Sequence, residues 1–314
     1  MKQIVVAGAG TMGVVLARLF AQAGYETTLW NRRQISLDRA REAISRDLAS
    51  ASGRGELSEN TETVTGRIVY TTDFASFEAA DFVIENIAED LEVKHEFWAR
   101  VSSLVPAETL LATNTSGLRV TDIAQAVKDP GRFCGMHFWN PPDLMPLVEV
   151  TKGEETREET ARAVHALALS LEKRPVIVKK DILGILGNRL QYAVLREALH
   201  ILALGAAGPE EIDAAMKYGP GFRYSMMGPF ETGDLGGLDI LNAVSSYLFP
   251  DLGAEEMSPV LADLTREGKL GVKSGGGFYD YAPGEGADIV ARRNDLLRAQ
   301  WDLLKDRPIR PDGK

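Results

Sequence analysis

The chain has few of the residues that build disulfides and metal sites. Its 314 residues include one cysteine, Cys134, and four histidines. A single cysteine cannot form an intrachain disulfide, which is typical of a reducing compartment, so we expect a cytoplasmic protein. A sequence without a Cys/His cluster does not predict a structural metal either. Cys134 precedes a glycine and is typical of a small buried residue rather than of a nucleophile.

Basic residues and long hydrophobic runs are also scarce. The chain has 35 Lys and Arg against 45 Asp and Glu, a net charge of −10. No basic stripe offsets this balance, which argues against nucleic acid or an anionic membrane surface as a partner. The first apolar run, residues 4–6, is too short for a secretory signal or a membrane span. The composition, 45% hydrophobic and 25% charged, fits a globular protein with two cored domains.

Short apolar runs alternate with helical patterns over residues 1–181. This alternation predicts an α/β domain with a doubly wound, mostly parallel sheet. A segment rich in Arg and Glu, residues 35–64, interrupts it. Apolar residues recur there at helical spacing, so we expect a helical arm that turns at Gly53, Gly55 and Ser58. The expected strands are residues 3–7, 26–30, 82–85, 110–113, 133–136 and 176–179.

No strands are expected after residue 181. The remainder, residues 182–314, is therefore predicted to be a second, all-α domain. Its C-terminal part contains a loop at residues 281–286, a last amphipathic helix and a frayed tail at residues 308–314. The expected helices are residues 182–205, 209–216, 237–247 and 289–304.

A glycine-rich turn stands between the first strand and the first helical pattern. It reads Gly8-Ala9-Gly10-Thr11-Met12-Gly13. In this strand–turn–helix setting the motif indicates a dinucleotide-binding Rossmann domain. Gly8 permits the tight turn, Gly10 lets the backbone approach the pyrophosphate, and Gly13 lets the helix pack on the sheet. The N–H groups at the start of the helix then bind the phosphates.

The end of the second strand leaves the choice of dinucleotide open. NAD enzymes usually carry an Asp or Glu there, on the ribose 2′-hydroxyl, but this chain has Asn31-Arg32-Arg33. Asn31 can bond a ribose hydroxyl without repelling a 2′-phosphate, and Arg32 or Arg33 could bind that phosphate. Alternatively, both arginines are solvated. We hypothesise a relaxed or NADP-leaning preference.

His137 and Glu149 are the main candidates for chemistry. His137 lies in one apolar run, and Glu149 interrupts the next one. Apolar residues flank Glu149 on both sides, so the pattern predicts a buried carboxylate, which needs a partner or a raised pKa. A nearby histidine would be that partner, and an oriented His–carboxylate pair moves one proton near neutral pH. The alternative is a structural histidine.

With these motifs the chain resembles the 3-hydroxyacyl-CoA dehydrogenase family, from about residue 2 to residue 281. The resemblance implies a Rossmann domain with a helical arm, a helical C-terminal domain that forms a homodimer, and NAD(H) as the cofactor. The other segments that carry it are Ile84-Glu85-Asn86-Ile87-Ala88-Glu89 with Lys94, Asn114-Thr115-Ser116, Gly187-Asn188-Arg189, Met227-Gly228-Pro229-Phe230-Glu231 and Gly271-Val272-Lys273-Ser274-Gly275-Gly276-Gly277-Phe278-Tyr279.

The resemblance also implies roles for individual residues. His137 corresponds to the general base that takes the hydroxyl proton of a secondary alcohol, and Glu149 to the carboxylate that orients it. Ser116 and Asn188 correspond to the groups that bind the substrate oxygen; turn and helix-cap duties are the alternative. For the two lysines in the cofactor set, a solvated surface position is the alternative. The cofactor-site residues implied are Glu89, Lys94, Asn140 and Lys273.

Three departures from the family pattern leave the substrate open. The arm has no lysine to bind a CoA phosphate. Its arginines, Arg39, Arg41, Arg46 and Arg54, could substitute, but they alternate with acids as on a solvated helix. Arg223 and the helix at residues 289–304 are similar to the branch that oxidises small hydroxy acids, such as gulonate and carnitine. The small-molecule substrate is therefore an L-3-hydroxyacyl-CoA, as in fatty acid metabolism, or a small carboxylate clamped by Arg223. A third hypothesis is a crystallin-like protein without enzymatic turnover. The presence of all four candidate residues argues against it; they are Ser116, His137, Glu149 and Asn188.

Overall fold

A computed structural model of the chain describes residues 1–306. The chain divides into two compact units, Met1–Gly187 and Asn188–Lys314. The predicted tail at residues 308–314 lies outside the described residues.

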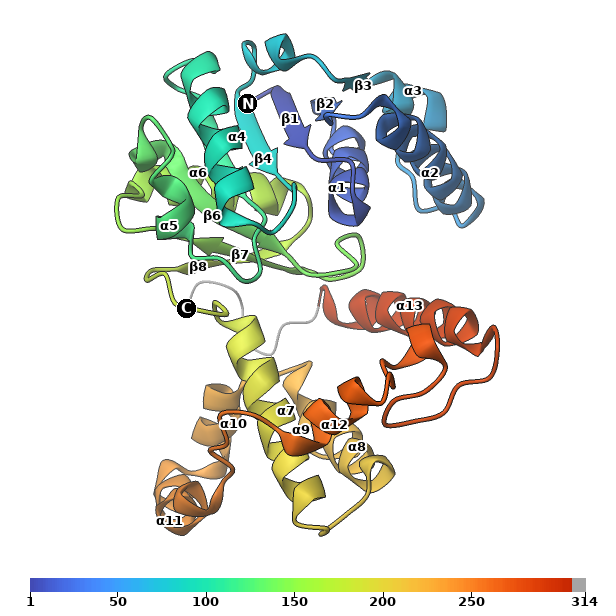
Figure 1. The fold of residues 1–314 in the computed structure, drawn as a ribbon, viewed down its shortest axis with the longest axis vertical. Helices are drawn as coiled ribbons and strands as arrows, with labels where there is room; N and C mark the ends of the chain where they lie inside the picture. Colours follow the sequence, from blue (N-terminus) through green and yellow to red (C-terminus); the bar gives the residue numbers. More distant parts are fainter. Residues whose placement is uncertain (307–314) are drawn as a thin grey trace. The chain divides into compact units, whose positions relative to one another are not determined.

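One eight-stranded sheet forms the centre of the first unit (Figure 1). The strand order is β3-β2-β1-β4-β5-β6-β7-β8, and every neighbouring pair is parallel except β6 with β7. The winding reverses between β1 and β4, and such a reversal opens a ligand crevice at the carboxyl ends of the strands. The prediction of a doubly wound, mostly parallel sheet is confirmed. The strands are β1 (Gln3–Ala7), β2 (Glu26–Trp30), β3 (Ile68–Thr71), β4 (Phe82–Glu85), β5 (Leu110–Thr113), β6 (Phe133–Phe138), β7 (Leu147–Thr151) and β8 (Arg174–Val178).

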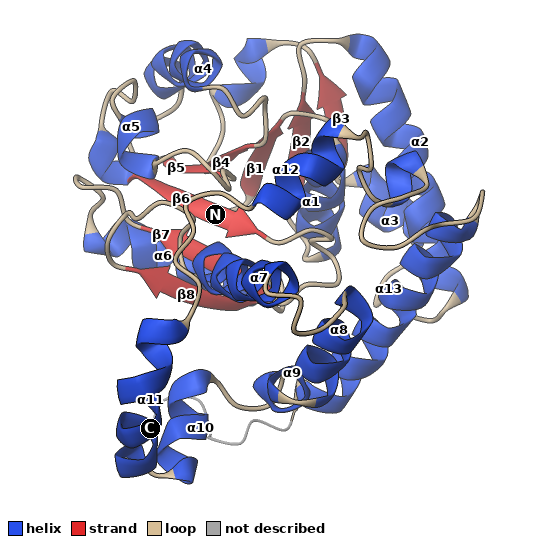
Figure 2. Cartoon of the chain, turned by 60° about the horizontal axis from the view of Figure 1, so that its bottom comes forward, coloured by secondary structure: helices blue, strands red, loops and turns tan. Residues whose placement is uncertain are grey.

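Helices cover both faces of this sheet (Figure 2). Apolar side chains of α1, α2 and α6 pack on one face, and those of α4 and α5 pack on the other. The central strands are mostly apolar because neither face meets water. The helices are α1 (Thr11–Gln22), α2 (Gln34–Gly53), α3 (Thr61–Gly66), α4 (Leu91–Leu104), α5 (Val120–Ala124) and α6 (Glu158–Ser170), with short 3-10 turns η1 (Phe74–Phe77) and η2 (Pro130–Arg132).

The predicted arm consists of two helices, α2 and α3, which pack beside α1. The apolar residues of α2 that recur at helical spacing, such as Ile44 and Leu48, are buried. The helix ends at Gly53, where the sequence predicts a turn. Asn60 then begins α3, because its side-chain oxygen accepts a hydrogen bond from the N–H of Thr63 at 2.7 Å.

Two strands, β3 and β7, are not among those expected from the sequence. β3 is an edge strand with Val69 exposed, so it lacks the apolar run of a central strand. β7 contains Glu149, whose charge breaks its apolar run. β6 also continues past Met136 to Phe138, so His137 belongs to the strand itself.

The second unit has helices as its regular elements over the described residues, apart from two isolated bridges at Gly276. No helix in residues 1–306 is long and apolar enough to cross a membrane. The helices are α7 (Gly187–Ala203), α8 (Pro209–Tyr218), α9 (Pro220–Tyr224), α10 (Pro229–Gly236), α11 (Leu238–Leu248), α12 (Pro259–Arg266) and α13 (Glu285–Leu304), with 3-10 turns η3 (Phe249–Asp251) and η4 (Val272–Ser274).

Two helix boundaries differ from the sequence prediction. The helix expected from residue 182 begins only at Gly187, because Gly184 and Ile185 have φ angles of 76° and 54°. That left-handed conformation cannot continue an α-helix. The last helix begins at Glu285 rather than at residue 289, so the expected loop at residues 281–286 is shorter than predicted.

Candidate active site

The glycine loop joins β1 to α1 at the carboxyl edge of the sheet. Gly8 has a φ of 107°, and a Cβ at this position would lie 2.5 Å from the carbonyl oxygen of Asn86. A Cβ on Gly13 would lie 1.8 Å from the carbonyl oxygen of Gly8. A Cβ on Gly10 would meet no atom within 4 Å, and no side chain caps α1. The loop therefore offers open backbone and a helix N-terminus, which fit a dinucleotide pyrophosphate.

Asn31 directly follows β2 and contacts this loop. Its Oδ1 accepts a hydrogen bond from the N–H of Ala9 at 3.4 Å, and its Nδ2 donates to the carbonyl of Arg33 at 3.2 Å. Asn31 thus steadies the glycine loop at the edge where a Rossmann domain binds ribose. Both Arg32 and Arg33 are exposed.

His137 and Glu149 are directly opposite one another on the antiparallel strands β6 and β7. Nδ1 of His137 lies 2.9 Å from Oε2 of Glu149. His137 is 7% exposed and Glu149 is wholly buried. The structure therefore brings together the two residues that the sequence pairs, at the sheet edge that also carries the glycine loop.

Glu149 accepts hydrogen bonds on both carboxylate oxygens. Nε1 of Trp139 donates to Oε2 at 3.1 Å, the same oxygen that His137 contacts. The N–H groups of Leu186 and Gly187, at the start of α7, donate to Oε1 at 2.9 Å each. Burial by itself raises the pKa of Glu149, but the hydrogen bonds from His137, Gly187, Trp139 and Leu186 outweigh it and lower the pKa to about 2.

A second buried carboxylate, Glu85, ends β4 at the same edge. Nζ of Lys94, from α4, lies 2.5 Å from Oε1 of Glu85, and the hydroxyl of Thr113 donates to Oε2 at 2.8 Å. Lys94 is wholly buried and also lies 3.3 Å from Oε2 of Glu89. The surface position that the sequence allowed for Lys94 is therefore wrong. Lys94 anchors Glu89 to the end of β4.

Glu89 in turn fixes the loop after β5. Its Oε1 accepts hydrogen bonds from the hydroxyl of Thr115 at 2.5 Å and from the N–H groups of Ser116 and Gly117 at 3.1 and 3.0 Å. Partial burial raises the pKa of Glu89, but the hydrogen bond from Thr115 and the charge of Lys94 hold it below its ordinary value. The loop is thus tethered through its backbone, and Ser116 itself is exposed.

Asn114 links three strand ends. Its Nδ2 donates to Oδ1 of Asn86 at 2.8 Å, and its Oδ1 accepts from the N–H of Phe138 at 2.8 Å. The residue next to His137 is therefore tied to the loop after β4, which packs against Gly8. Sequence reasoning misses this role, as it misses the partners of Glu85 and the indole of Trp139.

Two family models match adjoining parts of the chain. The model for the 3-hydroxyacyl-CoA dehydrogenase NAD binding domain matches residues 3–182, and the model for the C-terminal domain matches residues 184–281. The chain belongs to the 3-hydroxyacyl-CoA dehydrogenase family. This confirms the family resemblance, and with it an NAD(H)-dependent dehydrogenase that acts on a CH–OH group.

Individual relatives differ in how much of this dehydrogenase they match. A probable 3-hydroxybutyryl-CoA dehydrogenase of Deinococcus radiodurans is 39% identical over 278 residues, 88% of this chain and 99% of the relative. The 5-formyl-3-hydroxy-2-methylpyridine 4-carboxylate 5-dehydrogenase of Mesorhizobium japonicum is 33% identical over 310 residues, 98% of this chain and 99% of the relative.

Two solved structures also differ in how much of this chain they cover. A structure of the pyridine-carboxylate 5-dehydrogenase, described as an NAD+-dependent dismutase, has a TM-score of 0.88 at 32% identity and covers 98% of this chain and 99% of its own. The (S)-3-hydroxybutyryl-CoA dehydrogenase of Ralstonia eutropha has a TM-score of 0.76 at 30% identity, with coverage of 90% and 100%.

The remaining candidate residues of the dehydrogenase lie in the loop after β6 and in the second unit. Asn140 is exposed in the loop after β6, where a cis peptide bond joins it to Pro141. Asn188 follows Gly187 in the first turn of α7 and is partly buried. Arg223, on α9, and Lys273, on η4, are exposed residues of the second unit.

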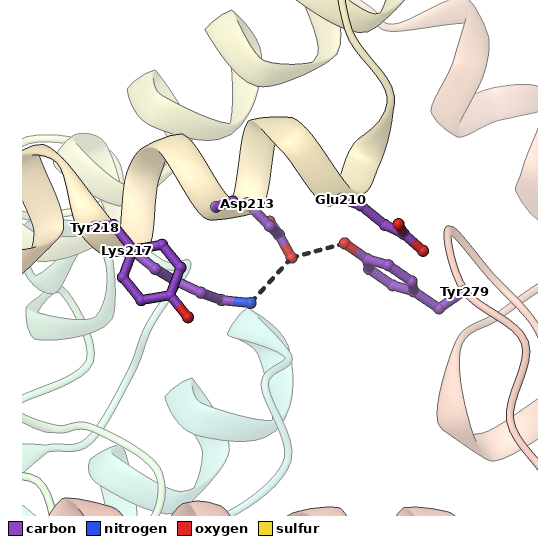
Figure 3. Close-up of a pocket in the computed structure, with 6 residues that line it drawn as sticks. Glu210, Asp213, Lys217, Tyr218 and Tyr279 are labelled. Atoms are coloured by element: carbon purple, nitrogen blue, oxygen red, sulfur yellow. Dashed lines mark hydrogen bonds and ion pairs between the residues drawn. The ribbon is translucent and has the colours of Figure 1, made fainter.

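The second unit has a polar pocket of its own, between α8 and the segment around Tyr279 (Figure 3). Asp213 accepts a hydrogen bond from the hydroxyl of Tyr279 at 3.0 Å and lies 3.6 Å from Nζ of Lys217. Burial and the bond to Asp213 raise the pKa of Tyr279 to about 12. The residues that line this pocket include none of those expected from the sequence. Lys273 lines a different, largely apolar pocket between α7, α8 and α12.

Cys134 is buried within β6, and burial raises the pKa of its thiol to about 12. A thiol with that pKa is not a thiolate nucleophile at neutral pH. In the part of the chain that the structure describes, no three His, Cys, Asp or Glu side chains gather as metal ligands. The His137–Glu149 pair is therefore the arrangement with the clearest means of moving a proton.

Proposed function

We propose that His137 is the general base for oxidation of a secondary alcohol and that Glu149 orients it. The observation that carries the proposal is the 2.9 Å contact between Nδ1 of His137 and Oε2 of Glu149, at the sheet edge that carries the glycine loop. Bound NAD+ supplies the hydride acceptor for this oxidation. A positioned base contributes about 10²- to 10⁴-fold to such a reaction.

Each residue of the pair has a defined task in this mechanism. The contact through Nδ1 requires that nitrogen to donate to Glu149, which leaves Nε2 of His137 as the acceptor of the hydroxyl proton. The imidazole becomes an imidazolium during oxidation, and the ionised Glu149 stabilises it. In the reverse direction His137 returns the proton to the forming alkoxide.

Ser116 and Asn188 are proposed to hold the substrate oxygen during this transfer. The loop of Ser116 is fixed through its backbone by Glu89, which leaves the hydroxyl of Ser116 available as a donor. Asn188 directly follows Gly187, whose N–H is bonded to Glu149. Ser116 is thus held by the network of Glu85, Lys94 and Glu89, and Asn188 follows a residue that bonds the proposed catalytic pair. These positions support a shared role.

We propose Gly8, Ala9, Gly10, Thr11, Met12 and Gly13 as the site for the cofactor pyrophosphate, and Asn31 for the ribose. Glu89 and Asn140 are proposed to border the nicotinamide, with Lys94 acting through Glu89 and Lys273 reaching the cofactor from the second domain. The two exposed arginines after Asn31 support some tolerance of NADP(H).

The first candidate substrate is an L-3-hydroxyacyl-CoA. It is supported by relatives named as 3-hydroxybutyryl-CoA dehydrogenases, which match 88–89% of this chain. The arm contributes few free cations to bind CoA: Arg41 stacks on Tyr70 with 4.5 Å to the ring centroid, and Arg54 is paired with Glu56. Arg39 and Arg46 are exposed on α2 and remain for that task.

The second candidate is a small free carboxylate, with Arg223 as its clamp. The observation in its favour is the extent of the match to the pyridine-carboxylate 5-dehydrogenase. That match covers 98% of the chain, whereas the matched 3-hydroxybutyryl-CoA dehydrogenases cover 88–90%. The C-terminal family model ends at residue 281, before α13 (Glu285–Leu304).

A screen of acetoacetyl-CoA against small keto and aldehyde carboxylates, each with NADH and NADPH, separates the two candidates. Arg223→Ala is the variant that tests the proposed carboxylate clamp. If a carboxylate is the substrate, loss of a bidentate ionic contact should raise its KM by about tenfold or more. With acetoacetyl-CoA the variant should stay near wild type. A hundredfold preference for NADH would contradict the relaxed cofactor choice.

Arg266→Ala is the control for this variant, because Arg266 is an exposed arginine of the same unit that pairs with Asp263. An Arg223→Ala enzyme that behaves like Arg266→Ala on every carboxylate would exclude the clamp. Absence of turnover with either substrate class would count against the proposed reaction.

We further propose a homodimer that forms through residues 182–314. The second unit exposes many large apolar side chains, including Phe230 at 89% and Tyr218 at 81%. Large exposed apolar side chains in such number support a protein–protein contact in this unit.

A further inference from the structure

Trp139 contacts the catalytic pair but has no part in the mechanism above. Its Nε1–H donates to Oε2 of Glu149 at 3.1 Å, and Nδ1 of His137 lies 2.9 Å from the same oxygen. The indole and imidazole ring centres are 6.1 Å apart. Two donors from the same strand end therefore share one carboxylate oxygen.

The indole ring is held in this position from its other side. A Cβ on Gly187 would lie 2.4 Å from Cζ2 of Trp139, so the ring packs closely on the first residue of α7. The N–H of that same residue donates to Oε1 of Glu149. Trp139, Gly187 and Glu149 thus form one interlocked group beside His137.

Sharing an oxygen has an electrostatic consequence. Each donor withdraws part of the negative charge of a carboxylate, and the charge that remains determines how strongly an imidazolium is stabilised. Glu149 neighbours His137 on β6 and Val176 on β8, and its other donors are Trp139 and the amides of Leu186 and Gly187. Of these groups only His137 titrates. The indole is thus the side-chain donor that can modulate the pair.

We propose that Trp139 is a positioning residue of the His137–Glu149 pair, whose indole N–H limits how strongly the carboxylate holds a protonated His137. This rests on the proposed function of the pair. The indole also fixes the carboxylate oxygen to which the imidazole is oriented.

Nitrogen-15 NMR of histidine-labelled protein tests this without any substrate. The chain has only four histidines, and His137→Gln identifies the resonances of His137. Trp139→Phe removes the N–H and keeps an aromatic ring on Gly187. Because more carboxylate charge then remains for the imidazolium, the titration midpoint of His137 should rise by about half a pH unit or more. The other three histidines should not move.

Trp98→Phe is the matched control. Trp98 is wholly buried in α4, and its Nε1 has no hydrogen-bond partner among the described residues. Its replacement removes an indole N–H that bonds nothing and should leave the titration of His137 unchanged. Trp139→Leu separates donation from packing, because it should shift the midpoint as far as Trp139→Phe does. Thermal melting and NADH fluorescence establish that each variant is folded.

A His137 titration that is the same in Trp139→Phe and wild type would overturn the proposal, as would a shift seen only in Trp139→Leu. Turnover distinguishes this failure from failure of the catalytic pair. If His137→Gln retains activity, the proposed function fails whatever the titration shows. If His137→Gln is inactive and the titration of Trp139→Phe is unchanged, only the role of Trp139 fails.

Discussion

Two carboxylates are buried in one sheet of this molecule, and they differ in their partners. Glu85 is bound by Lys94, a side chain that is itself wholly buried. Glu149 is bound by His137, which keeps 7% of its surface exposed. A lysine–carboxylate pair is a fixed ion pair near neutral pH, whereas a histidine gains and loses its proton there. The pair that contains a histidine is therefore the one that we propose as catalytic.

The two pairs also differ in what they hold. The Glu85–Lys94 pair extends through Glu89 to the backbone of Ser116 and Gly117, so it fixes a loop. The Glu149–His137 pair includes backbone donors from the start of α7, so it links the sheet to the helix that carries Asn188. The Glu85–Lys94 pair shapes the carboxyl end of the sheet, and the Glu149–His137 pair contains the residue that we propose as the proton acceptor.

Breaking the buried Glu85–Lys94 pair should lower the free energy of unfolding more than breaking an exposed ion pair does. Lys94→Met leaves Glu85 buried without its cation, and removal of one partner from a buried pair costs about 3–5 kcal/mol in the free energy of unfolding. Urea denaturation measures this cost. Lys152→Met, which breaks the exposed pair with Glu158, is the control and should cost about 1 kcal/mol or less.

The double variant Glu85→Gln with Lys94→Met completes this comparison. It removes the unpaired charge together with the lysine, so it should recover part of the stability that Lys94→Met loses. Equal losses in Lys94→Met and Lys152→Met would show that the buried pair is not fixed as described.

The ionised Glu149 should make the free energy of unfolding depend on pH in the acid range. Its folded pKa of about 2 lies below the value of about 4.3 for an unfolded glutamate, so its contribution to stability is fully present above about pH 4.5. The contribution is lost as the pH falls toward 2. Urea unfolding at several pH values should give a shallower pH dependence over this range for Glu149→Gln than for wild type. Identical slopes would mean that the fold does not favour the ionised carboxylate.

The sequence predicts the frame of the molecule well. The glycine loop is recognised from its motif between a strand and a helix. Most strands are recognised from apolar runs that are buried on both faces. Both signals are local in the sequence, so no long-range contact is needed to predict them. β3 is missed because an edge strand with Val69 exposed has no such run. The start of α7 is misjudged because apolar spacing continues through residues 182–186, and only backbone geometry at Gly184 and Ile185 interrupts it.

The site is predicted less completely. His137 and Glu149 are visible because a lone acid in an apolar run needs a partner. Lys94 had a signal too: it stands at helical spacing with Phe97, Trp98 and Val101, the buried face of α4. No signal in the sequence predicts the hydrogen bond from Trp139 to Glu149. This bond depends on the side-chain conformation at the end of β6 and on the approach of Gly187.

Turnover by His137→Gln is the most direct test of the central claim. Glutamine keeps the polarity of the side chain but cannot accept the hydroxyl proton. The account predicts that kcat falls by about 10²-fold or more while NADH binding, followed by fluorescence titration, is unchanged. Activity within tenfold of wild type, with NADH bound equally well, would contradict it.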